Sequence, residues 1–180
     1  MAASSIAVVD TAEFRRWLRS LRDARARARI LKSIDHLSLG HFGNTKSVGG
    51  GINELRVDYG PGYRVYFARR GARLILLAYG GDKSRQGLSV RVKSPLHGSP
   101  NMGIETSRWD TADFLDSPDA ILAYVEAVFE DGDPELIVLA LNNVARAKGL
   151  AHDALTAQSD ITSVIGTLKA LGLELTARAA

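Results

Sequence analysis

Hydrophobic and polar positions along the first half of the chain predict a short strand, two helices and three further strands. The apolar run over residues 6–9 is the length of a short strand. A helix follows it, capped by Asp10 or Thr11, and Asp23 can cap a second helix over residues 24–37. Apolar side chains recur at helical spacing in both segments: Phe14, Trp17, Leu18 and Leu21 in the first, and Ile30, Ile34 and Leu37 in the second.

Three strands are predicted over residues 52–59, 63–69 and 72–79. Apolar and polar side chains alternate in the first two, so that Arg56 and Arg64 point away from the apolar face. The Gly60-Pro61-Gly62 sequence and Gly71 supply the turns of two hairpins, and the third strand is apolar on both faces. The order of elements predicts a small α+β domain over residues 1–90.

The second half has a different pattern. Residues 91–107 lack sustained periodicity and are rich in Ser, Gly and Pro, which indicates a linker. Ser117-Pro118 and Asp133-Pro134 each start a helix, and a last helix runs from about Asp160 towards Gly172. A short helix is also expected over residues 150–157. Residues 108–180 are therefore expected to form an all-α domain.

Charge divides the chain in the same place. Residues 1–93 contain 18 Lys and Arg against 7 Asp and Glu, a net +11, whereas residues 94–180 contain 5 against 13, a net −8. Such asymmetry favours a polyanion-binding half and an acidic half that masks it. The alternative is that each half is merely solvated by its own charges.

Composition excludes several classes of protein. The chain has no cysteine, so neither a disulfide framework nor a thiolate metal site can form. The N-terminus lacks the basic flank and long apolar run of a signal peptide, and no stretch approaches the length of a spanning helix. We expect a cytoplasmic protein without a membrane partner, a cofactor or a metal.

Several motifs of the first half occur in the order found in a known toxin family. They are Phe14-Arg-Arg-Trp17-Leu, Glu54-Leu-Arg56, the long string Tyr59-Gly-Pro-Gly-Tyr-Arg64-Val-Tyr-Phe67, and Gly80-Gly-Asp-Lys83-Ser. Over residues 5–87 the chain resembles the HigB-like addiction-module branch of the RelE/ParE toxins. Residues 106–177, with Arg108-Trp-Asp110-Thr-Ala-Asp-Phe-Leu115 and Gly132-Asp-Pro134, resemble the cognate HigA-like antidote. Such toxins and antidotes are normally encoded as neighbouring separate chains.

The resemblance implies a RelE-type, ribosome-dependent mRNA endoribonuclease in which the 2′-hydroxyl of the RNA attacks and the protein supplies cations and acid–base groups. The matching catalytic candidates are Arg64, Lys83 and Arg56, and the RNA-binding candidates are Lys46, Arg64 and Arg85. The alternative for each arginine on a strand is a solvated or salt-bridged side chain. Asp110, Glu126 and Asp131 are candidates for neutralising the toxin, with a solvated helix face as the alternative.

Two departures from the family leave alternatives open. After Gln86 a non-helical segment replaces the toxin's C-terminal helix, so the alternatives are residual endoribonuclease activity and its loss. The helix-turn-helix of the antidote is shortened, and its last helix carries only Lys169. The alternatives are a DNA-binding transcriptional autoregulator with operator DNA as its partner, an inactive interaction remnant, and a gyrase-directed toxin. The expected partners are the two domains for each other, the mRNA or ribosome, and further copies of the chain in a homo-oligomer.

Overall fold

The computed structural model describes residues 6–71, 73–77, 105–150, 155–156, 159–174 and 176. The chain divides into two compact units, Met1–Trp109 and Asp110–Ala180. Its fold is mixed α+β, and the described residues form one six-stranded sheet and five α-helices.

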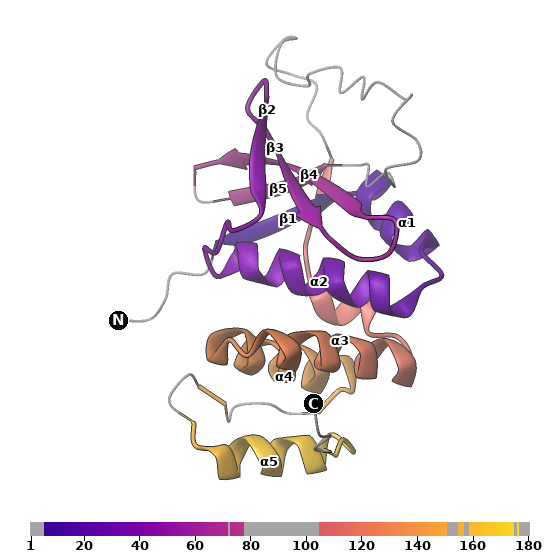
Figure 1. Cartoon of the computed structure of the whole chain (residues 1–180), viewed down its shortest axis with the longest axis vertical. Helices are drawn as coiled ribbons and strands as arrows, with labels where there is room; N and C mark the ends of the chain where they lie inside the picture. The colour runs from indigo at the N-terminus through magenta and orange to yellow at the C-terminus, as the bar shows by residue number, and fades with distance from the viewer. Residues whose placement is uncertain are drawn as a thin grey trace. The chain divides into compact units, whose positions relative to one another are not determined.

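The first unit is built on the sheet. It contains, in chain order, β1 (Ala7–Thr11), α1 (Ala12–Ser20), α2 (Ala24–Ser38), β2 (Thr45–Gly49), β3 (Ile52–Val57), β4 (Tyr63–Arg70), β5 (Arg73–Leu77) and β6 (Thr106–Arg108). The strands lie in the order β2-β3-β4-β5-β1-β6 (Figure 1). Strands β1 and β5 are parallel, and every other neighbouring pair is antiparallel.

Caps and apolar faces explain the two helices of this unit. The Thr11 hydroxyl accepts a hydrogen bond from the backbone N–H of Phe14 at the start of α1. The Asp23 carboxylate does the same for two N–H groups of α2. The helices bury Phe14, Leu18, Ile30, Leu31, Ile34 and Leu37, and the sheet buries Leu55, Val57, Val65 and Phe67. Burial of each such side chain stabilises the unit by about 1.5–3 kcal/mol.

Two strands were not predicted from the sequence. Strand β2 is exposed at most positions and therefore lacks the apolar alternation by which strands are recognised. The glycines expected to be a flexible approach, Gly49, Gly50 and Gly51, all have positive φ and turn the chain from β2 into β3. Strand β6 occupies residues that we assigned to the end of the linker and the first position of the second domain.

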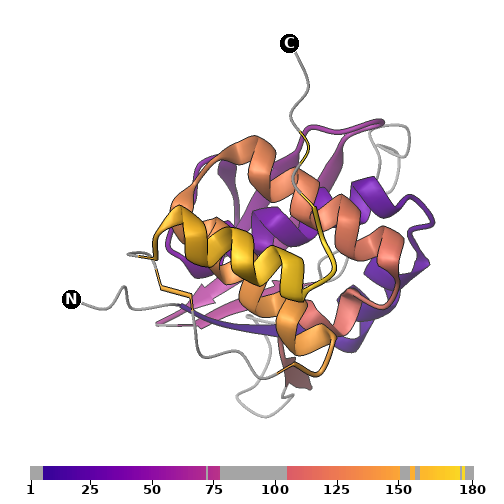
Figure 2. The same ribbon diagram turned by 90° about the horizontal axis from the view of Figure 1, so that it is seen from below.

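The second unit is helical in its described residues. It contains the 3-10 helix η2 (Thr111–Phe114) and the helices α3 (Pro118–Asp131), α4 (Pro134–Ala147) and α5 (Ile161–Ala170). Figures 1 and 2 show α5 lying across the pair formed by α3 and α4. Ser117, Asp133 and Asp160 cap the three α-helices, as their positions in the sequence predict. The short helix expected over residues 150–157 falls largely outside the described residues.

A buried polar pair lies in the core of the helical unit. Asn143 Nδ2 donates a hydrogen bond to the Tyr124 hydroxyl at 3.0 Å, and both residues are almost fully buried. The hydroxyl therefore keeps a partner inside an otherwise apolar core of residues such as Phe114, Leu136 and Leu141. Across the described residues of both units, no helix is long and apolar enough to span a bilayer.

Candidate nucleic-acid interface

The alternation of side chains on β3 and β4 separates a buried face from a polar one. Leu55 pairs with Val65 in the strand register, and both side chains are buried. On the opposite face, Arg56 pairs with Arg64, and Glu54 pairs with Tyr66. Because side chains on one face of an antiparallel pair are close across the strands, these four polar groups form one cluster.

Glu54 lies at the centre of this cluster. Its carboxylate accepts a hydrogen bond from Arg56 Nε at 2.8 Å and another from the Tyr66 hydroxyl at 3.2 Å. Arg64 Nη1 lies 3.6 Å from the second carboxylate oxygen. Glu54 is only 5% exposed, whereas Arg56 is exposed and Arg64 is half-buried. One buried carboxylate thus fixes two guanidinium groups on the surface of the sheet.

The pKa shifts in the cluster follow from these contacts. Burial alone would raise the pKa of Glu54, but the hydrogen bond from Arg56, the positive charge of Arg64 and the Tyr66 hydroxyl together lower it below its usual value. The hydrogen bond to Glu54 raises the pKa of Arg56. Burial raises the pKa of Tyr66, and the neighbouring Glu54 charge raises it further. At neutral pH, Glu54 is therefore ionised and Tyr66 keeps its proton.

These protonation states define what the cluster can do. A carboxylate with a lowered pKa is a weak general base near neutrality, so Glu54 is suited to orienting the arginines rather than to accepting a substrate proton. Two adjacent guanidinium groups present planar, permanently charged donors that suit a phosphate group. The hydroxyl of Tyr66 is a hydrogen-bond donor beside them. The arrangement is chemically suited to a phosphate group.

Of the other predicted cations, only Lys46 is among the described residues. Lys46 on β2 is exposed and pairs with Glu54 in the β2–β3 register, so it lies beside the arginine cluster on the next strand. Lys83 and Arg85 lie outside the described residues. The structure thus brings Lys46, Arg56 and Arg64 onto three neighbouring strands.

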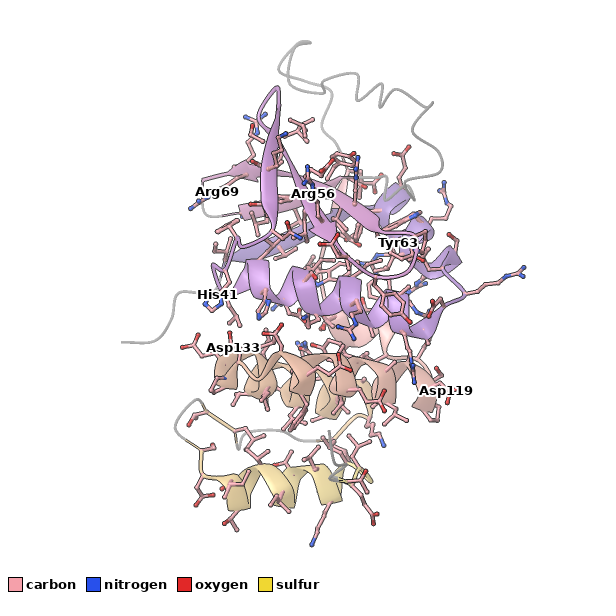
Figure 3. All side chains as sticks on the ribbon, in the orientation of Figure 1. His41, Arg56, Tyr63, Arg69, Asp119 and Asp133 are labelled. Atoms are coloured by element: carbon pink, nitrogen blue, oxygen red, sulfur yellow. The ribbon has the colours of Figure 1, made fainter. Side chains whose placement is uncertain are left out.

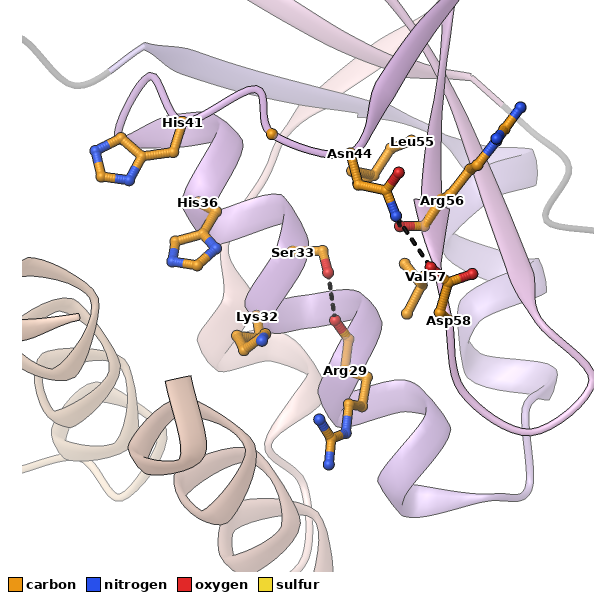
Figure 4. Close-up of a pocket in the computed structure, with 11 residues that line it drawn as sticks. Arg29, Lys32, Ser33, His36, His41, Asn44, Leu55, Arg56, Val57 and Asp58 are labelled. Atoms are coloured by element: carbon orange, nitrogen blue, oxygen red, sulfur yellow. Dashed lines mark hydrogen bonds between the residues drawn. The ribbon is translucent and has the colours of Figure 1, made fainter. Parts of the chain in front are cut away.

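A cleft of about 430 Å³ lies on the helix side of the same unit, between α2, the loop after it and the end of β3 (Figure 4). Arg29, Lys32 and His36 line it from α2, and His41 lines it from the loop. The Arg29 guanidinium lies 5.5 Å from the centre of the Tyr59 ring. The cleft is therefore predominantly basic. Arg56, a member of the arginine cluster, also lines the cleft at the end of β3.

The loop after α2 is tied to β3 at the wall of this cleft. Asn44 Nδ2 donates hydrogen bonds to the carbonyl of Arg56 at 3.3 Å and to the carboxylate of Asp58 at 3.2 Å. The ring of His36, on α2, lies 5.6 Å from the ring of His41 in the loop that follows the helix (His41 is labelled in Figure 3). Within either unit taken alone, no three described His, Asp or Glu side chains come close enough together to hold a metal ion.

The three acidic candidates of the second unit differ in their surroundings. The Asp110 carboxylate caps η2 by accepting a hydrogen bond from the Ala112 N–H at 2.9 Å, and it pairs with Arg146 Nη2 at 2.9 Å. Glu126 and Asp131 are exposed on α3. Asp110 therefore links η2 to α4 within its own unit, a role that the sequence did not predict.

Sequence reasoning also missed the contribution of Glu54 and Tyr66. Both were visible as members of the polar face, two residues away from Arg56 and Arg64 respectively. Their contact depends on the strand register, which an isolated sequence does not specify. Because side chains alternate between the two faces of a strand, the pattern that predicts an outward Arg56 also predicts that Glu54 lies on the same face.

Comparison with known proteins relates each unit to a family. Residues 16–95 match the family model described as "Phage derived protein Gp49-like (DUF891)", a toxin-family domain. Residues 105–170 match the model described as "Probable addiction module antidote protein". The chain is a toxin–antitoxin-related protein. We refer below to Met1–Trp109 as the toxin-family unit and to Asp110–Ala180 as the antidote-family unit.

A protein of Haemophilus influenzae, described only as uncharacterised, is 44% identical to this toxin–antitoxin-related chain over 87 residues. The alignment covers 88% of that protein and 48% of this chain. The chain therefore belongs to the same family as the Haemophilus protein, which corresponds in length to about half of it. No solved structure matches the chain.

Proposed function

We propose that the chain is a toxin–antitoxin fusion in which a RelE-type, ribosome-dependent mRNA endoribonuclease domain is bound and neutralised by its linked antidote domain. The observation that carries this proposal is the pair of arginines, Arg56 and Arg64, fixed by Glu54 on the polar face of a toxin-family unit. The match of the remaining chain to an antidote family supports the second half of the proposal.

The proposed role of Arg56 and Arg64 is electrostatic. When a 2′-hydroxyl attacks the neighbouring phosphate, negative charge accumulates on the phosphate oxygens, and the 5′-oxygen leaves with a proton. Arg64 and Arg56 hold the phosphate and offset that charge, because their guanidinium groups are already positioned before the substrate arrives. Lys46 extends the surface for the RNA backbone, and Lys83 and Arg85 are the further cations proposed for the same site.

Neutralisation is proposed to rest on opposite charge. The toxin-family unit contains 19 Lys and Arg against 8 Asp and Glu, whereas the antidote-family unit contains 4 against 12. Attraction between such surfaces guides association and competes with nucleic acid for the basic groups. Glu126 and Asp131 on the exposed surface of α3 are the acidic groups that we propose for this role. Pairing within one chain and exchange between copies in a homo-oligomer both fit the proposal.

The described residues give less support to operator DNA as a partner. The antidote-family unit has three described cations, and two of them are occupied within the unit. Arg146 pairs with Asp110, and Lys148 Nζ donates a hydrogen bond to the carbonyl of Leu171 at 2.7 Å. Lys169 alone would then be available for phosphate contacts from α5, too few for the electrostatic affinity on which DNA binding depends.

The test is mRNA cleavage in a translating bacterial extract by residues 1–109. This fragment keeps β6, which a fragment ending at the predicted linker would lose. We expect cleavage by this fragment, little or none by the full chain, and loss of cleavage in Arg64→Ala. Arg69→Ala is the matched control, because Arg69 is on the same strand but lies over the Phe42 ring. Equal cleavage by Arg64→Ala and the unaltered fragment would refute the proposed site.

A further inference from the structure

The boundary between the two sequence families does not coincide with the boundary between the two structural units. The antidote match begins at residue 105, but the toxin-family unit extends to Trp109. The intervening residues include β6, which adds to the sheet beside β1. A segment with an antidote sequence is therefore built into the toxin-family fold.

Strand β6 is fixed to β1 by main-chain pairing. The register pairs Val9 with Arg108 and Asp10 with Ser107, and the N–H of Trp109 donates a hydrogen bond to the Val8 carbonyl at 3.1 Å. In an antiparallel ladder, alternate N–H groups point to the same neighbour. The N–H of Ser107 therefore points towards β1, and that of Thr106 points away from it.

Trp109 anchors the end of this strand. It is only 9% exposed, and its ring meets the fully buried Phe14 ring edge-on, with 5.8 Å between centroids. Aromatic contacts of this kind, buried at the end of a short segment, are typical of the residues that dominate a binding interface. The strand supplies register, and the tryptophan supplies apolar contact area.

A partly buried ion pair between Arg15 and Asp10 lies at the β1 edge beside this segment. The Asp10 carboxylate is fully buried and receives Arg15 Nε at 2.9 Å and Arg15 Nη2 at 3.1 Å. The same Nη2 lies 3.4 Å from the Arg108 carbonyl, within reach of a hydrogen bond. Arg15 thus joins the start of α1 to the backbone of β6.

We propose that residues 105–109 are the segment with which an antidote of this family clasps its toxin, by adding a strand to the β1 edge and placing a tryptophan against Phe14. The inference rests on the proposed toxin–antitoxin function, and it names the partner of the β1 edge as the N-terminal segment of an antidote. The fused chain carries this contact in its own sheet. The Haemophilus relative, which aligns with 48% of this chain over 88% of its own length, indicates that one half also occurs without the other. Where toxin and antidote are separate proteins, the same strand would form the contact between them.

The test uses the full chain with a protease site inserted between residues 94 and 100, cut after folding. We expect the two pieces to stay together, and Trp109→Ala or Ser107→Pro to raise their dissociation constant about 30-fold or more, as loss of a central aromatic contact or strand pairing does. Thr106→Pro is the matched control, because its N–H points away from β1, and it should change the constant less than about threefold by the same reasoning.

Trp17→Phe would leave Trp109 as the only tryptophan, so its fluorescence reports separation of the pieces directly. Pieces that separate on cutting, or an unchanged dissociation constant in both Trp109→Ala and Ser107→Pro, would overturn the inference. Neither readout depends on RNA cleavage. An inactive toxin domain would therefore defeat the proposed function while the association measurement still decided this inference.

Discussion

Arg56 and Arg64 lie directly opposite each other in the register of β3 and β4, on the same face of the sheet. Two like charges in this position repel each other unless an anion lies between them. The Glu54 carboxylate supplies that anion from within the fold, at 2.8 Å from Arg56 and 3.6 Å from Arg64. The pair is thereby held side by side at the surface, as the proposed phosphate contact requires.

Replacement of Arg64 should weaken RNA binding without affecting the fold. In residues 1–109, Arg64→Ala should lower affinity for a labelled RNA and reduce the slope of log affinity against log salt by about one, because one phosphate contact is lost. Fluorescence anisotropy over a range of salt concentrations measures both. Arg69→Ala, on the same strand, should leave the slope closer to that of the unaltered fragment. An unchanged slope in Arg64→Ala would show that Arg64 does not contact phosphate.

Replacement of Glu54 should destabilise the toxin-family unit. Glu54→Gln keeps the shape of the side chain but removes the charge that holds two arginines, and we expect a loss of about 1–3 kcal/mol in the free energy of unfolding. Asp58→Asn is the matched control, because the exposed Asp58 accepts a hydrogen bond from Asn44 at the surface. This substitution should lower the free energy of unfolding by less than about 1 kcal/mol. Urea unfolding of the full chain tests the difference, and equal losses would contradict it.

The Glu54 contribution should depend on pH with a defined sign. Because the pKa of Glu54 is lowered in the folded state, the ion pair stabilises the protein above the ordinary value near 4.5. This stabilisation is lost as pH falls through the lower folded pKa. The difference in unfolding free energy between the unaltered chain and Glu54→Gln should therefore be constant from pH 5 upwards and shrink below it. A constant difference down to about pH 3 would be inconsistent with a lowered pKa.

Two glycines of the antidote-family unit should respond with opposite signs to substitution by alanine. Gly132 ends α3 with φ +78°, so Gly132→Ala should destabilise by about 1 kcal/mol. Gly166 lies inside α5 with no atom within 4 Å of an added Cβ, so Gly166→Ala should stabilise that helix by about 0.5–1 kcal/mol. Thermal unfolding compares the two, and a stabilising Gly132→Ala would contradict the left-handed cap.

Asp110 should act within its own unit. Asp110→Asn keeps a capping oxygen for Ala112 but loses the ion pair with Arg146, whereas Asp110→Ala loses both. Since the ion pair is partly exposed, we expect Asp110→Asn to lower the free energy of unfolding by less than about 1 kcal/mol. Asp110→Ala should lower it by about 1 kcal/mol more, because the cap is lost as well. A double-mutant cycle with Arg146→Ala isolates the pair. Zero coupling would mean that the ion pair contributes nothing to stability.

Local signals in the sequence predicted most of the helices of this protein. The caps Thr11, Asp23, Ser117 and Asp133 each precede an apolar run at helical spacing, and each begins a helix in the structure. These signals act within one turn of chain and need no tertiary contact. The alternation that predicted β3 and β4 is equally local, because one face of each strand is buried.

Features that depend on distant residues were not predicted. Strand β6 follows a segment without periodicity, and its three exposed residues are a strand only because β1 offers an unpaired edge. The link between Glu54 and Arg64 likewise exists only through the register of β3 and β4. The outward direction of Arg64 was predictable from its own strand, but the carboxylate that fixes it was not.

The central claim is tested most directly by bacterial growth after induction of residues 1–109, beside the full chain and the Arg64→Ala fragment. A toxin domain neutralised by its linked antidote predicts growth arrest by the fragment, normal growth with the full chain, and relief of the arrest by Arg64→Ala. Normal growth with a fragment shown to be soluble and folded would contradict an active toxin domain, and arrest by the full chain would contradict neutralisation.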